Sequence, residues 1–275
     1  MSQFLNLMDA ITGIIAFTLY LLSTLGLLLR LKGDVFFNQK PIAYLLLPGF
    51  AAVILHCFIL YKSMLGINGF QIGFFDAASS VAMVISLLVL LMSIKRHTEI
   101  LAVVILPVSA LTLLIQSVSP SSHMLPYDAP QGLKIHVLVS IIAYSLLGFA
   151  ACMSLVLSLQ NRMLHNHQPG GIMKKLPPLQ VMEKLLFDFI LAGFIGLTLA
   201  LLSGFIFLED LFSQHLVHKT ALSIIAWLVF AILLIGRFTI GWRGRKAIRW
   251  TLSGFASLML AYFGSKFVLE FIVLT

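Results

Sequence analysis

Histidine is the residue type in this chain that is best suited to bind a metal ion or a haem iron. The chain has 8 histidines. On the topology derived below, one side of a membrane holds His56, His123, His136, His215 and His218. Neutral imidazole is a common metal ligand, and ionisable groups in or beside a membrane are rare and usually functional. This clustering predicts a metal or haem site at one mouth of a helical bundle.

The elements that would position these histidines are membrane-spanning helices. Of the 275 residues, 60% are hydrophobic and 10% are charged, and the mean hydropathy is +1.05. Polar breaks separate about eight apolar runs, most of them near the roughly 20 residues that a helix needs to cross a bilayer. The predicted spans are 10–29, 42–61, 76–94, 100–117, 135–159, 185–208, 220–235 and 247–272. We therefore expect an all-α, polytopic integral membrane protein.

The predicted spans leave no room for a separate soluble domain. We expect a single membrane domain over residues 1–275, with the first four helices in 10–117 and the last four in 135–272. Segment 1–9 has no basic residue, so the first span is predicted to be a membrane helix and not a cleaved signal.

The positive charges are distributed unevenly between the two predicted sides. Of the 18 basic residues, only Lys62, Lys134, Lys219 and Lys266 flank the side that holds the five histidines. The positive-inside rule then places both termini outside the cytoplasm. A basic cytoplasmic face beside anionic lipid accounts for the net charge of +8, so membrane lipid is the expected partner and nucleic acid is not.

The fifth predicted span carries a polar stripe. His136, Ser140, Tyr144, Gly148 and Cys152 recur every four residues and so share one helix face. Polar groups that faced hydrocarbon would go unpaired, so this stripe is expected to face the interior of the bundle. Close helix packing explains the small residues of the stripe, but it does not explain the histidine at its head.

Several segments resemble the cytochrome c assembly family. The run His-Val-Leu-Val-Ser-Ile-Ile-Ala-Tyr, which starts at His136, is similar to a helix of that family. The likeness continues through 202–204, the Gly-Trp-Arg-Gly-Arg-Lys run at 241–246 and 261–264, and more weakly at 69–72. It covers the second half of the chain better than the first, and the layout resembles the short HemX-like or YpjD-like branch.

The resemblance implies a haem-handling protein of the inner membrane, which takes part in cytochrome c assembly or in haem export. It matches His136 to the first outer haem ligand of the family and carries over no second ligand. The tryptophan-rich outer segment of the haem-presenting members has no counterpart in 208–218. We therefore expect a protein that holds, exports or delivers haem, or senses it, and that is not an enzyme.

The expected cofactor is haem b, bound without a covalent link and held by two histidines on opposite faces of the ring. His136 is the first predicted axial ligand, and the alternative for it is an interfacial histidine bonded to water or to a loop carbonyl. Either His56 or His218 is the predicted second ligand. For His56, inside an apolar helix, a structural hydrogen bond is the alternative, and His218 could simply be solvated. Lys62, Lys134 and Lys219 stand at the same level, where they could neutralise the haem propionates.

Two other functions and two other sites stay open at this point. The chain could transport another small solute, or it could be a non-catalytic membrane partner with an assembly or regulatory role for other integral proteins of cytochrome or haem assembly. Asp76 could belong to an ion path or cap a helix start. A weaker zinc site could use Glu209, Asp210, His215 and His218.

Overall fold

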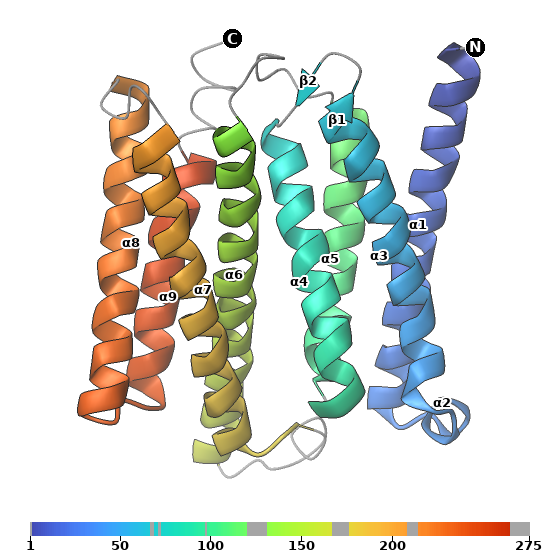
Figure 1. Ribbon diagram of the computed structural model, residues 1–275. Coiled ribbons are helices and arrows are strands. Elements are labelled where there is room, and N and C mark those ends of the chain that lie inside the picture. The colour runs from blue at the N-terminus through green and yellow to red at the C-terminus, as the bar shows by residue number, and fades with distance from the viewer. Residues whose placement is uncertain are drawn as a thin grey trace. The chain divides into compact units, whose positions relative to one another are not determined.

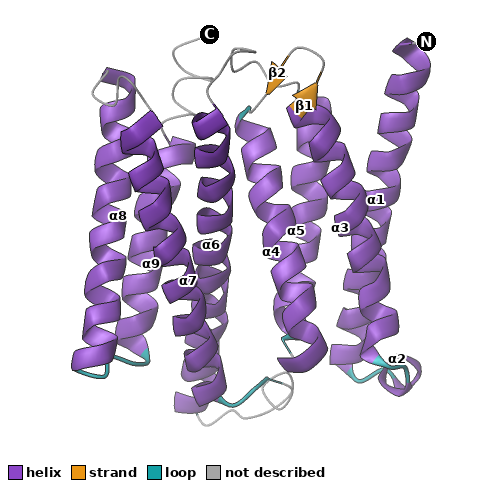
Figure 2. Cartoon of the chain, viewed as in Figure 1, coloured by secondary structure: helices purple, strands orange, loops and turns teal. Residues whose placement is uncertain are grey.

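The fold is almost entirely helical, as Figures 1 and 2 show. The computed structural model describes residues 2–66, 69–70, 73–96, 98–119, 131–166, 176–207 and 214–264. Within these ranges, 7 helices are long and apolar enough to cross a membrane. The prediction of an all-α polytopic membrane protein is therefore confirmed.

Part of the eighth predicted span, 247–272, lies outside the described residues. Helix α9 (Arg245–Met259) begins this span and passes directly into a π-helical segment (Leu260–Gly264). The count of eight spans and the placement of both termini outside the cytoplasm stay predictions.

The helices fall into two compact units, each of which is described by itself. The first unit contains α1 (Ser2–Lys32), α2 (Val35–Gln39), α3 (Ile42–Met64), α4 (Phe74–Arg96) and α5 (Glu99–Val118). The second unit contains α6 (Gln131–His165), α7 (Leu179–Phe207), α8 (Gln214–Thr239), α9 and the π-helical segment. The division falls between the fourth and fifth predicted spans. A single membrane domain over the whole chain stays a prediction.

In the first unit, four long helices form a closed ring in which α1 and α4 each pack against both α3 and α5. Two short strands, β1 (Leu65–Gly66) and β2 (Gly69–Phe70), pair antiparallel between α3 and α4. These strands and the five-residue helix α2 are not among the predicted elements, because hydropathy detects only long apolar runs.

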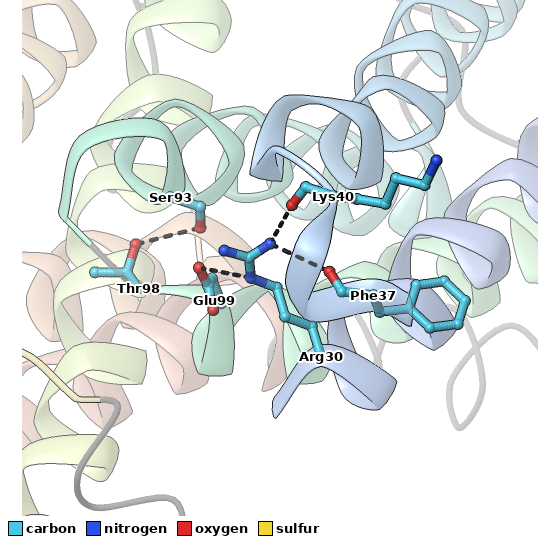
Figure 3. Close-up of polar contacts among 6 residues, drawn as sticks. All are labelled: Arg30, Phe37, Lys40, Ser93, Thr98 and Glu99. Carbon is cyan, nitrogen blue, oxygen red and sulfur yellow. Dashed lines mark hydrogen bonds and ion pairs between the residues drawn. The ribbon is translucent and has the colours of Figure 1, made fainter. Parts of the chain in front are cut away.

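One arginine fixes the connection between α1 and α3 to the start of α5 (Figure 3). Arg30 Nη1 donates hydrogen bonds to the carbonyl oxygens of Phe37, at 3.4 Å, and Lys40, at 2.6 Å. Its Nε lies 3.8 Å from Oε1 of Glu99, whose side chain is buried. A charged partner offsets part of the cost of burying the Glu99 carboxylate, and the contacts of Arg30 join the α1–α3 connection to the start of α5.

The helices extend beyond the predicted spans. Helix α6 starts four residues before the predicted 135–159 and ends six residues after it, and the seventh span, predicted as 220–235, is the 26-residue helix α8. Hydropathy marks the part of a helix that lies in hydrocarbon, whereas the hydrogen-bond ladder continues through polar flanks. Helix α5 contains Pro107 in its interior and continues through it.

The second unit also forms a ring, in which α6 and α8 each pack against both α7 and α9. Helices α6 and α7 pack most extensively in this unit. Two glycines of α7 lie at their contact. A Cβ atom added to Gly196 would lie 3.1 Å from the Cβ and 3.3 Å from the Cα of Ala143. A Cβ atom added to Gly193 would lie 2.7 Å from the Leu147 side chain. Small residues let helix backbones approach closely, and these contacts bring α6 and α7 together.

We predict that Gly196→Leu will lower the thermal unfolding temperature of the purified protein, at a cost of about 1–3 kcal/mol for overpacking. The Ala143 backbone leaves no room for the new side chain. The matched control is Gly13→Leu in α1, because a Cβ atom at Gly13 meets no atom within 4 Å. Equal unfolding temperatures for the two variants would contradict the close contact of α6 with α7.

Candidate functional site

His136 lies in the second turn of α6 and reaches across to α7. Its Nδ1 atom is 3.0 Å from the carbonyl oxygen of Ala200 and 3.0 Å from Oγ of Ser203. The Ser203 hydroxyl itself donates to the Ala200 carbonyl, at 2.9 Å. Both neighbours therefore present lone pairs to Nδ1, so Nδ1 carries the ring proton and donates it.

This tautomer leaves a lone pair on Nε2 of His136. Among the described residues, no side chain or backbone group hydrogen-bonds Nε2, and the residue is only half-buried. Histidines that bind metals almost always donate their other ring N–H to a carbonyl, a carboxylate or water, which fixes the tautomer and the orientation of the ring. The described contacts of His136 thus engage Nδ1 and leave Nε2 without a described partner.

The polar stripe of α6 faces other helices of the second unit at the two positions with long side chains. His136 contacts α7, and Tyr144 donates a hydrogen bond to the carbonyl oxygen of Leu258 in α9, at 2.7 Å. Ser140 donates within α6, to the His136 carbonyl oxygen at 2.7 Å. Because α7 and α9 are the neighbours of α6 in the ring, the stripe faces the interior of the unit at these positions, as predicted.

His56 has a different environment in the first unit. It is completely buried in α3, with Nδ1 3.1 Å from the Tyr20 hydroxyl and Nε2 2.8 Å from Ser79 Oγ. Both ring nitrogens are therefore engaged, and a bond to iron would require one of these hydrogen bonds to break. The contacts favour the structural alternative for His56.

The other candidate histidines lie partly or wholly outside the described residues. His218 is in the second turn of α8, and nothing is described of its side chain or of that of His215. His123 and the acidic pair 209–210 are also outside the described part of the chain. The predicted zinc site therefore falls outside the described side chains. In the described part, no group of three or more His, Cys, Asp or Glu residues is placed to hold a metal ion.

Asp76 occupies the third position of α4 and accepts three hydrogen bonds. The donors are the backbone N–H of Gly73 at 2.9 Å, Ser63 Oγ at 3.0 Å and Gln116 Nε2 at 3.0 Å. A carboxylate at this position that accepts from the residue before the helix is half of a capping box. These contacts favour the helix cap over the ion path.

The partners of His136 are the part of the site that the sequence does not reveal. Ala200 and Ser203 lie on α7, which also carries Gly193 and Gly196. Those two glycines contact Leu147 and Ala143 of α6 closely. Small side chains on α7 thus leave its backbone open to an imidazole of the neighbouring helix.

Comparison with known families finds a match over most of the chain. The profile of the family described as Cytochrome C assembly protein matches residues 44–273. The chain belongs to this family. It is 28% identical over 223 residues to the inner membrane protein YpjD of Escherichia coli (strain K12), across 80% of this chain and 84% of YpjD. The family resemblance and its YpjD-like branch are therefore confirmed.

Two further relatives are cytochrome c biogenesis proteins named CcsA. The chain is 26% identical over 210 residues to CcsA of Prochlorococcus marinus subsp. pastoris, across 65% of this chain and 66% of the relative. It is 28% identical over 152 residues to CcsA of Chlamydomonas reinhardtii, across 54% of this chain and 42% of that relative. No solved structure matches the chain. Together with the apolar helices, the comparisons identify a multi-pass protein of the inner membrane.

We predict that His56→Ala will destabilise the protein by about 2–4 kcal/mol, because the Tyr20 and Ser79 hydroxyls lose their partner and a cavity forms. The control is Cys57→Ala, since Cys57 is the next residue and is exposed. Thermal unfolding of the two purified variants measures the difference. A His56→Ala protein that unfolds like the wild type but no longer binds haem would instead assign His56 as a ligand.

Proposed function

We propose that this protein binds haem b without a covalent link, with Nε2 of His136 as an axial ligand of the iron. It holds the haem, or delivers it, in cytochrome c assembly. The observation that carries this proposal is the contact of His136 Nδ1 with Ala200 and Ser203, which leaves Nε2 without a partner among the described residues. Membership of the cytochrome c assembly family and the similarity to two cytochrome c biogenesis proteins support it.

We propose His218 as the second axial ligand. His136 and His218 lie in the same unit, and each is in the second turn of its helix, roughly 6–8 Å along the axis from the helix start. Helices α6 and α8 both pack against α7 and α9, so they occupy opposite corners of the ring. Histidines on opposite corners of the helix ring suit a haem, whose iron takes one axial ligand on each face of the porphyrin. His56 is the weaker candidate, because both of its nitrogens are engaged.

In this proposal, the residues of the chain bind and orient the cofactor and make no new bond to its porphyrin. Haem supplies a redox-active iron and a large apolar ring. His136 holds the iron through Nε2, and the Ala200 carbonyl keeps the imidazole from rotating. Lys134, half-buried in the first turn of α6, supplies positive charge for a propionate. We therefore propose that the chain is not an enzyme.

The visible spectrum of the detergent-purified protein, oxidised and then reduced with dithionite, tests the proposal. We predict a Soret band and sharp reduced bands for the wild type, and a clear weakening of both in His136→Ala and His218→Ala. The control is His165→Ala, since His165 is an exposed residue in the last turn of the same helix, α6. It should leave the spectrum unchanged.

Two results would contradict the haem proposal. The first is a folded, monodisperse wild type that shows no Soret band after purification with haem available. The second is a His136→Ala spectrum that equals that of the wild type. Either result would favour the non-catalytic membrane partner, and the co-purifying proteins would then be identified.

A further inference from the structure

The backbone of the turn between α8 and α9 is held in one conformation by two glycines and two hydrogen bonds. Gly241 and Gly244 have φ values of 74° and 56°, in the left-handed region that favours glycine. Between them, the Trp242 backbone N–H donates to the Gly236 carbonyl at 3.0 Å, and Arg237 Nη1 donates to the Trp242 carbonyl at 3.3 Å. These contacts fix the shape of the turn.

The aromatic side chain of this turn is held in place as well. The ring of Trp242 lies 5.4 Å from the ring of Trp250 in α9. It also packs closely on the end of α8, because a Cβ atom added to Gly236 would come within 2.5 Å of it. The turn thus presents a fixed pair of indoles at one end of the second unit.

Four basic residues lie close to the two tryptophans in the sequence, and we call them the basic turn: Arg243, Arg245, Lys246 and Arg249. All four side chains are exposed. None of them forms an ion pair with a described carboxylate. Lys246 contacts an aromatic ring instead, with Nζ 5.7 Å from the centre of Trp242. One carboxylate reaches the turn, because the Gly244 backbone N–H donates to Oε1 of Glu183 at 2.8 Å. Four cations beside one carboxylate leave the turn with a net positive charge, which attracts an anion.

The apolar neighbours of the basic turn indicate where it lies in the membrane. Phe238 and Ile240, at the end of α8, are each 73% exposed. Such side chains are stable against hydrocarbon, whereas tryptophan is enriched at the boundary with the headgroups. Trp242 and Trp250 therefore indicate the headgroup level, and the four cations stand beside it.

We infer that the basic turn binds the phosphate group of an anionic glycerophospholipid. Guanidinium groups match the geometry of phosphate oxygens with two parallel hydrogen bonds. A free phosphate ion offers the same oxygens, but it has no acyl chains for Phe238 and Ile240 to contact. The lipid satisfies both the charged and the apolar parts of the surface. This inference is independent of haem binding.

Native mass spectrometry of the detergent-purified protein tests the inference, with phosphatidylglycerol and phosphatidylcholine offered in equal amounts. We predict that the wild type retains phosphatidylglycerol severalfold more than phosphatidylcholine. The variant Arg243→Gln/Arg245→Gln/Lys246→Gln should lose this preference. The matched control, Lys32→Gln/Lys40→Gln/Lys95→Gln, removes the same charge from exposed residues of the first unit and should keep the preference.

A second variant keeps the inference testable if the first does not fold. Arg243→Lys/Arg245→Lys retains every charge but loses the paired hydrogen bonds, so it should retain less phosphatidylglycerol than the wild type. Equal loss of the phosphatidylglycerol preference in the glutamine variant and in the first-unit control would overturn the inference. So would full retention of phosphatidylglycerol in both variants of the basic turn. Inorganic phosphate is added in a further run, and complete displacement of the bound phosphatidylglycerol by it would also overturn the inference. The last result would assign the turn to a free phosphate ion.

Discussion

The close approach of α6 and α7 is the constraint on which the candidate site depends. Gly193 and Gly196 place no side chain between the two helices, so the α7 backbone comes within reach of α6. That distance brings the Ala200 carbonyl to 3.0 Å from Nδ1 of His136. The helix contact supplies a backbone acceptor for the imidazole N–H. The helix packing and the orientation of the His136 ring therefore depend on the same few atoms.

His56 and His136 differ in how many of their ring nitrogens are engaged by neighbouring groups. His56 joins α1, α3 and α4 through Tyr20 and Ser79, and it uses both ring nitrogens to do so. In the same unit, Ser86 and Ser109 join α4 to α5 through their hydroxyls, 2.6 Å apart. These contacts pair buried polar groups of the first unit, although Oε1 of Gln116 has no partner among the described residues. His136 uses only one nitrogen among the described residues.

Much of this architecture can be predicted from the sequence, because apolar runs of membrane length and a four-residue polar stripe are local patterns. The family could be recognised from the run that starts at His136. The partners of the histidines could not be predicted. Tyr20 and Ser79 are 36 and 23 residues from His56, and Ala200 is 64 residues from His136. Such contacts depend on which helices pair and on how each is rotated about its axis, which hydropathy does not encode.

The most direct test of the central claim is chemical rescue of a ligand-free variant. His136→Gly removes the imidazole and leaves space where it stood, and haem spectra are then recorded with and without added imidazole. If Nε2 of His136 binds the iron, added imidazole should restore the low-spin spectrum that the variant lacks on its own. A His136→Gly protein with the wild-type spectrum in the absence of imidazole would contradict the claim. So would a folded variant that imidazole does not restore.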